Sequence, residues 1–387
     1  MPSPRTAVEL IDTIADATRA GRRLSICGGG SKHAIGSPTP EATPLDMRGF
    51  SGVIDYDWAE LVLTAGAGTP LAEIEVLLAQ RNQMLAFEPF DHGPIFGATA
   101  GMATIGGVIA AGVAGSQRVT QGGARDHLLG FQAVSGHGER FVAGAKVVKN
   151  VTGFDLPKLA AGSWGRLFAM TEVTLKVLPA PRARLTKLLE GIDFNDALGV
   201  MSAALGSQAD VAAAAYLPSH EASPARLAIR IQGFGPSVAA RAAMLDNLMG
   251  RFGAVHTASE EEADVIWGEL RLLTPLRSAG PLWRINVAAS RSPTIVAALI
   301  AVGAVWLADW GGGLIWATVD GNAQELRGVV EAARGHATLV RAPEEMRLAV
   351  PALHPQPKGV VALEERIRRS FDPDGVFETG RFQDIVE

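Results

Sequence analysis

A run of three glycines directly after an apolar segment constrains this chain more than any other feature. Leu24–Cys27 has the composition of a short strand, and Gly28–Gly30 follow it at once. Consecutive glycines let backbone N–H groups turn toward one point and let a bulky anion approach the main chain. Ser31 and Lys32 add a hydroxyl and a positive charge to the same loop. The pattern fits the diphosphate of a nucleotide, and a tight surface turn is the alternative.

The residues after this loop exclude the two common glycine-rich nucleotide motifs that open a helix. His33 stands where the dinucleotide fingerprint needs its third glycine, and Pro38 and Pro40 prevent a helix from starting there. The chain also contains no Gly-Lys-Ser or Gly-Lys-Thr sequence, so it has no Walker loop. A nucleotide at this site is therefore held by loops alone.

A second cluster of glycines lies further along the chain, in Gly97–Gly107, and small residues lead from it to Ser116. Two loops of this kind indicate one extended ligand that lies against the main chain at both ends. A dinucleotide has that length. The alternative is a closely packed turn, because glycine also marks places where chain segments pack tightly.

Length and charge exclude several classes of protein. The chain has 387 residues, of which 48% are hydrophobic and 19% charged, so it is long enough for two or three folded domains and is not disordered. Its formal charge of −5 provides no basic field for nucleic acid or for an anionic membrane. The uncharged run His92–Gln117 contains too many glycines for a spanning helix, so we expect no direct membrane span.

The single cysteine, Cys27, limits the redox and metal chemistry of the chain. Disulfides, thiolate zinc sites and iron–sulfur clusters each need several cysteines. The eight histidines are scattered and form no His-Glu-x-x-His or other compact spacing, so we expect no catalytic metal. The N-terminus lacks the basic and apolar segments of a signal peptide, which favours a cytoplasmic location, with any membrane association through a partner.

Composition divides the chain into three regions. Residues 1–180 are rich in glycine and read as an α+β domain that binds the nucleotide. Residues 181–345 alternate strands and helices in two successive β-α-β-β-α-β passes, which fold into an antiparallel sheet covered by helices, a cap domain. The prolines within 178–181 mark the boundary, because paired prolines stop strands and stiffen linkers. Residues 346–387 are expected to be a separate closing segment.

Two further features carry candidate chemistry. Ala161–Gly165 approximates the nucleophile elbow of a serine hydrolase, but Pro157 and Lys158 argue against the buried strand that must precede it. Arg284 follows Trp283 on a predicted strand, where a guanidinium can hold a substrate carboxylate by two parallel hydrogen bonds. The alternative for Arg284 is an exposed arginine on an edge strand with an ordinary ion pair.

Several segments, taken in order, are similar to those of a known family, the FAD-linked oxidases of the vanillyl-alcohol-oxidase type. The glycine-rich form of the first loop, the short cap and the tail most resemble the FAD-binding subunits of bacterial glycolate oxidase within that family. The segments that carry the resemblance are Cys27–Gly36, Ala65–Leu71, Thr104–Gly107, Lys149–Leu156, Gly162–Gly165 and Phe371–Phe382.

The resemblance implies a two-lobed α+β domain that binds FAD. Non-covalent FAD is implied as well, because members with covalent flavin have a histidine at the position that Ser31 occupies here. The first loop would hold the diphosphate, the second would follow the ribityl chain and flavin, and two later residues would close over the cofactor. The implied contacts are Gly28, Gly29, Gly30, Ser31, Lys32, His33, Gly101, Thr104, Ile105, Gly106, Gly107, Ser116, Gly165 and Val173.

The resemblance also implies a subunit of a 2-hydroxy-acid dehydrogenase of the glycolate oxidase type. Electrons would pass from FAD to a cysteine-rich iron–sulfur subunit, in a complex with a homologous flavin subunit. Relatives that oxidise such substrates have a His-Gly-Asp-Gly-Asn type of segment in the cap, and this chain has none. One alternative is therefore a subunit that holds FAD only as an electron relay or structural element. Another is a reductase of the peptidoglycan-precursor type, whose nicotinamide site has no recognisable sequence here.

Overall fold

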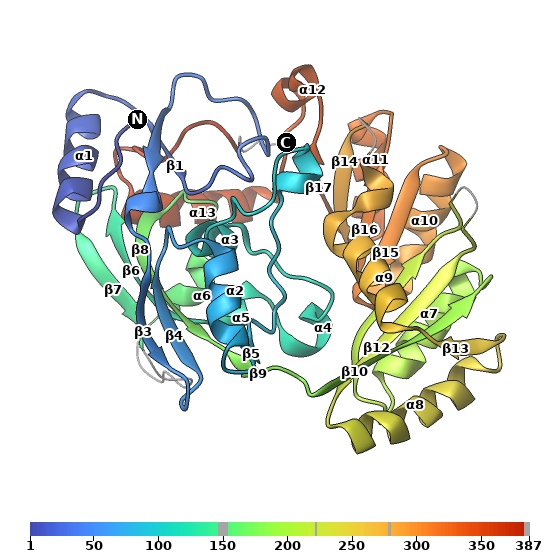
Figure 1. Ribbon diagram of the computed structural model, residues 1–387. Coiled ribbons are helices and arrows are strands. Elements are labelled where there is room, and N and C mark those ends of the chain that lie inside the picture. The colour runs from blue at the N-terminus through green and yellow to red at the C-terminus, as the bar shows by residue number, and fades with distance from the viewer. Residues whose placement is uncertain (146–153, 221–222, 278–279, 383–387) are drawn as a thin grey trace. The chain divides into compact units, whose positions relative to one another are not determined.

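A computed structural model describes residues 1–145, 154–220, 223–277 and 280–382 (Figure 1). The chain falls into two compact units. The first unit consists of Met1–Gly115, Gly122–Ala180 and Pro355–Glu387. The second consists of Ser116–Gln121 and Pro181–His354. The chain therefore enters the second unit twice, once for only six residues, and its C-terminal segment returns to the first.

The first unit mixes helices and strands. Its elements are α1 (Ala7–Arg19), β1 (Leu24–Cys27), β2 (Thr43–Asp46), β3 (Val53–Asp57), β4 (Val62–Gly66), α2 (Leu71–Ala79), β5 (Gln83–Met84), α3 (Ile105–Ala111), α5 (Ala124–His127), β6 (Leu128–Ser135), β7 (Arg140–Gly144), α6 (Leu156–Ala160), β8 (Phe168–Lys176), β9 (Leu178–Pro179) and α13 (Lys358–Phe371).

Two sheets form the framework of this unit. Strands β1 and β2 pair in parallel, and β3, β4, β8, β6 and β7 form a five-stranded antiparallel sheet in that order (Figure 1). Leu10 and Ile14 of α1 are buried in a core that also contains Leu24 of β1. Val376 and Phe377 complete this core, so the C-terminal segment closes the part of the unit from which the first glycine loop emerges.

Local sequence signals account for the helix starts in this unit, with one correction. The sequence predicts a helix over 6–20, and α1 begins after Thr6, whose hydroxyl accepts a hydrogen bond from the N–H of Glu9 at 3.2 Å. The sequence predicts a helix that has Thr69 as its N-cap and Pro70 as its first residue, but α2 begins at Leu71 with Pro70 as its N-cap. The Thr69 hydroxyl instead donates to the carbonyl of Gly66 at 2.6 Å, so it stabilises the turn between β4 and α2.

The second unit is an antiparallel sheet with helices packed on it. Its elements are α4 (Arg118–Gln121), β10 (Ala183–Glu190), α7 (Phe194–Leu205), β11 (Val211–Leu217), β12 (Arg226–Gly233), α8 (Gly235–Met249), β13 (Val255–Thr257), α9 (Glu260–Leu272), β14 (Leu282–Asn286), α10 (Ser292–Ala301), β15 (Val305–Asp309), β16 (Leu314–Thr318), α11 (Ala323–Ala332), β17 (His336–Arg341) and α12 (Glu344–Ala349).

The element order of this unit contains β-α-β-β-α-β twice, with α9 between the passes. All eight strands join one sheet in the order β13-β10-β12-β11-β15-β16-β14-β17, so each pass contributes one half. Apolar side chains of α7, α8, α10 and α11 share one core with the sheet. The expected α+β fold, with helices covering an antiparallel sheet, is confirmed.

Candidate FAD-binding site

The two glycine-rich loops of the first unit touch each other. A Cβ atom added at Gly29 would lie 1.5 Å from the carbonyl oxygen of Met102, and one added at Gly28 would lie 2.2 Å from Oγ1 of Thr104. Real side chains do not approach other atoms this closely, so glycine is required for the loops to meet. The structure therefore brings together the two loops that the sequence assigns to one ligand.

Open space remains beside both loops. Gly30 and Gly101 have φ angles of +77° and +98°, which favour glycine, and a Cβ added at either would meet no described atom within 4 Å. Backbone in this conformation can present its N–H groups to a concave surface that suits an anion. The loops thus press against each other at Gly28 and Gly29 and leave room for a ligand at Gly30 and Gly101.

One acidic side chain holds the second loop in place. The backbone N–H groups of Gly101, Met102 and Ala103 all donate to Oδ2 of Asp91, at 2.8, 2.8 and 3.2 Å. Oδ1 of Asp91 accepts another hydrogen bond, at 2.8 Å, from the N–H of Gly93. No sequence signal marks Asp91, because an acidic residue ten positions before a loop becomes informative only when the fold brings its carboxylate to the N–H groups of that loop.

Helix α3 begins at the end of the second loop and packs against a third glycine-containing segment, Ala65–Leu71. Thr104 is the N-cap of α3, and its Oγ1 accepts a hydrogen bond from the N–H of Gly107 at 3.4 Å. The N–H of Gly106 donates to the carbonyl of Ala67 at 2.7 Å, and a Cβ added at Gly106 would lie 2.7 Å from the same oxygen. Small residues are therefore needed on both sides of this contact.

Lys32 is a buried cation at the first loop. Its exposed fraction is 8%, and its Nζ lies 3.4 Å from Oγ of Ser31. Burial lowers the pKa of Lys32 to about 8; the negative charge of Asp91 opposes this shift and the positive charge of Arg381 adds to it. Among the described residues, no carboxylate lies within ion-pair distance of its Nζ. A buried ammonium with no described carboxylate within ion-pair distance, next to open glycine backbone, fits the diphosphate of FAD.

The C-terminal segment forms hydrogen bonds with the residues that follow the first loop. Arg381 donates from Nε to the carbonyl of Ile35 at 2.6 Å and from Nη2 to the carbonyl of Lys32. The carbonyl of Arg381 accepts a hydrogen bond, at 2.9 Å, from the N–H of Ser37. Its guanidinium also lies 5.8 Å from the ring of Trp164. Residues more than three hundred positions apart therefore fix the geometry of the loop.

The remaining predicted contacts in the first unit occupy different environments. A Cβ added at Gly165 would lie 3.3 Å from Cβ of Ile26, which belongs to the strand that leads into the first loop. Val173 is fully buried within the five-stranded sheet. Ile105 is fully buried in α3, whereas His33 is exposed, with its Nδ1 2.7 Å from the carbonyl oxygen of Gly30.

Two predictions fall outside this cluster. Ser116 is grouped with the second unit, where its Oγ donates to Oδ2 of Asp309 at 2.7 Å. Of the segment Lys149–Leu156, which contributes to the family resemblance, residues 149–153 lie outside the described residues.

Arg284, the candidate substrate contact, lies on an interior strand of the second unit. Its strand, β14, is between β16 and β17, so Arg284 is not on a sheet edge. The side chain is half-buried, with its guanidinium carbon 5.1 Å from the ring of Trp310 and 5.9 Å from that of Trp316. Its Nη1 donates to Oδ1 of Asn286 at 2.6 Å. This environment differs from that of a solvated surface arginine.

The described residues form neither a metal site nor a membrane-spanning helix. In the described ranges, no group of three or more His, Cys, Asp or Glu side chains is arranged to hold a metal ion. No helix in that part of the chain is both long and apolar enough to cross a lipid bilayer.

Comparison with known proteins identifies relatives along the whole chain. Residues 3–144 match the family described as FAD binding domain. The glycolate oxidase subunit GlcE of Escherichia coli (strain K12) is 32% identical over 374 residues, which are 96% of this chain and 96% of the relative. The glycolate oxidase subunit GlcD of Bacillus subtilis (strain 168) is 27% identical over 201 residues, 51% of this chain and 38% of the relative.

A solved structure supports the same fold. Substrate-bound p-cresol methylhydroxylase superposes with a TM-score of 0.72 at 13% identity, covering 98% of this chain and 87% of that one. At this level of identity the similarity concerns the fold alone. The expected vanillyl-alcohol-oxidase type of architecture is confirmed.

Proposed function

This chain belongs to the FAD-binding oxidoreductase family that includes the glycolate oxidase subunit GlcE, and from that premise we propose that it is the FAD-holding subunit of a dehydrogenase complex for small 2-hydroxy acids. The observation that best supports this is the contact between the two glycine loops beside the buried Lys32. Bound FAD supplies an acceptor for two electrons. The chain supplies the cradle that holds it.

The first and second loops would contact different parts of FAD. Backbone N–H groups around Gly30, together with the ammonium of Lys32, would neutralise the diphosphate; the open space beside Gly30 and the burial of Lys32 support this role. The second loop, fixed by Asp91 and continued by α3, would lie along the rest of the cofactor. The absence of a side chain at these glycines lets the cofactor lie directly against the main chain.

Electrons must leave the reduced cofactor through another molecule. The chain has one cysteine, which cannot ligate an iron–sulfur cluster by itself. We therefore assign the outlet to a cysteine-rich iron–sulfur subunit, in a complex that also contains a homologous flavin subunit. The relatives GlcE and GlcD are both described as subunits of glycolate oxidase, which supports an assembly of this kind.

A second candidate is an FAD relay that does not itself oxidise the substrate. It is favoured by the missing His-Gly-Asp-Gly-Asn type of segment, which catalytic relatives are expected to contain. In that case the homologous flavin subunit would react with the 2-hydroxy acid, and this chain would pass the electrons on.

Anaerobic titration of the FAD-loaded chain with glycolate tests the proposed function. We expect loss of the oxidised-flavin absorbance, and no change with acetate, which has the carboxylate but no hydroxyl to oxidise. Acid denaturation should then release intact FAD, as expected for a cofactor without a covalent link. Bleaching only after the homologous flavin subunit is added would establish the relay instead. Unchanged flavin absorbance, both with and without the homologous flavin subunit, would refute an oxidoreductase role with glycolate.

A further inference from the structure

Two arginines of the second unit share one aromatic ring. The guanidinium carbon of Arg118, at the start of α4, lies 4.5 Å from the centre of the Trp310 ring, and that of Arg284 lies 5.1 Å from it. Trp310 is 6% exposed, whereas Arg118 is exposed and Arg284 half-buried. Cation–π attraction explains why each guanidinium is near the ring, but it does not remove the repulsion between the two charges.

The backbone holds Trp310 in a conformation that is costly for a bulky residue. Its φ angle is +55°, in the left-handed region that strains the backbone of a bulky residue. Asp309 supports the turn, because its Oδ1 accepts a hydrogen bond from the N–H of Trp310 at 2.7 Å. Its Oδ2 accepts the hydrogen bond from Ser116 at 2.7 Å, which links the turn to the segment that contains Arg118.

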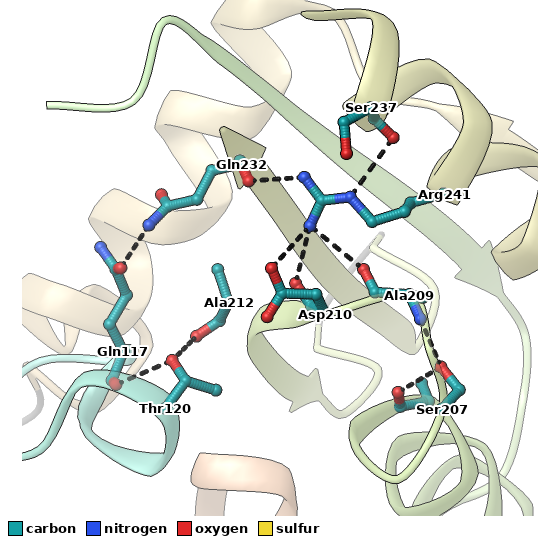
Figure 2. A network of polar contacts seen from close by, with 10 residues as sticks. Gln117, Thr120, Ser207, Ala209, Asp210, Ala212, Gln232, Ser237 and Arg241 are labelled. Carbon is teal, nitrogen blue, oxygen red and sulfur yellow. Dashed lines mark hydrogen bonds and ion pairs between the residues drawn. The ribbon is translucent and has the colours of Figure 1, made fainter. Parts of the chain in front are cut away.

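Neighbouring contacts fix that short segment to the sheet. Oε1 of Gln117 accepts a hydrogen bond from Nε2 of Gln232 at 2.5 Å, and the hydroxyl of Thr120 donates to the carbonyl of Ala212 at 3.0 Å (Figure 2). Gln117 and Thr120 therefore anchor both sides of Arg118. The segment that carries Arg118 is therefore hydrogen-bonded to the sheet on both sides of this residue.

The paired positive charges have no negative partner within the described part of the chain. Neither Arg118 nor Arg284 forms an ion pair with a carboxylate there. Of the five N–H donors of Arg284, one hydrogen bond, to Asn286, uses Nη1. Burial, and after it the charge of Arg118, lowers the pKa of Arg284 to about 10. A bound anion would offset the burial of Arg284 and its repulsion by Arg118, since the anion adds an opposite charge and accepts hydrogen bonds from the remaining N–H donors.

We infer that Arg118 and Arg284, whose guanidinium groups both lie near the ring of Trp310, form a binding site for the carboxylate of a small 2-hydroxy acid. The choice of ligand rests on the proposed function, whereas the site itself rests on the two arginines and the ring. Arg284 provides the main contact, because its guanidinium is partly desolvated and its planar fork matches a carboxylate. Arg118 adds a weaker, solvent-screened attraction.

Calorimetric titration of the FAD-loaded full chain with glycolate tests this site. We expect Arg284→Gln to weaken glycolate binding by about 10- to 150-fold, because it removes a charge-assisted contact. Arg118→Gln should weaken it by about two- to fivefold. Arg81→Gln is the matched control, since Arg81 lies 5.4 Å from the ring of Trp58 in the first unit and should leave the Kd unchanged. Glycolamide, which lacks the negative charge, should not bind measurably.

Thermal unfolding of each variant separates lost binding from lost folding. If Arg284→Gln unfolds, Arg284→Lys keeps the charge but not the planar fork, and it should still weaken binding more than Arg118→Gln does. Unchanged glycolate affinity in a folded Arg284 variant, or equal binding of glycolamide, would overturn the inference. Glycolate binding without flavin reduction would leave the site intact and count against catalysis by this chain. Flavin reduction unaffected by both arginine variants would support the proposed function and reject the site.

Discussion

Gly29→Ala is expected to weaken FAD binding by about 100-fold or more. The added Cβ would lie 1.5 Å from the carbonyl oxygen of Met102, which is backbone and cannot move away by a simple rotation. The two loops must therefore separate, at an overpacking cost of about 3 kcal/mol or more, and the binding site that they form is lost. The measurement is the flavin content of the purified variant, followed by titration of the apoprotein with FAD.

Gly199→Ala provides the control for the glycine substitution. Gly199 lies within α7, and a Cβ there would meet no described atom within 4 Å, so FAD binding should be unchanged. Circular dichroism should show that both variants retain the secondary structure of the parent. Full flavin occupancy in a folded Gly29→Ala variant would show that the loops do not need to touch, and the assignment of the site would fail.

Lys32→Met should weaken FAD binding at pH 7 by about 10- to 150-fold, since one charge-assisted contact to the diphosphate is lost. The effect should depend on pH. The pKa of Lys32 is lowered to about 8 in the free protein, and a bound diphosphate must raise it, because an anion favours the charged amine. Affinity should therefore be constant well below pH 8 and fall by up to about tenfold per pH unit above it.

The same titration in the Lys32→Met variant should show no such decline, so the two proteins converge at high pH. The unfolding free energy of the apo variant should not fall, because the substitution removes a buried cation that has no ion-pair partner among the described residues. A parallel pH profile in both proteins would remove Lys32 from the diphosphate site.

Local sequence patterns predicted much of the fold. The apolar segments of the sequence predict a helix over Phe194–Leu205 and strands over Leu24–Cys27, Val211–Leu217 and Val305–Asp309, and α7, β1, β11 and β15 have these bounds. Helix α9 is additional to the two predicted β-α-β-β-α-β passes, although Ser259 and the acidic first turn of the helix are an N-cap signal. Thr69 was assigned the wrong role because a threonine before proline suits both a cap and a turn, and only the tertiary contact decides between them.

The glycine loops could be identified from sequence because glycine patterns report backbone geometry directly. The groups around them could not. Asp91 acts through the N–H groups of residues ten to twelve positions away, and Arg381 acts through carbonyls near the other end of the chain. Arg118 gains its significance from Trp310, to which no sequence motif links it. Contacts of this kind are properties of the folded chain rather than of any local segment.

Hydrogen exchange of the full chain with and without FAD tests the central claim most directly. The account predicts that FAD slows amide exchange in Gly28–Lys32 and in Gly101–Gly107 together, because both loops hold the same cofactor. Helix α8, in the second unit, serves as the internal reference and should be unaffected. Protection of only one loop, or of neither, in a chain shown to contain FAD would contradict the account.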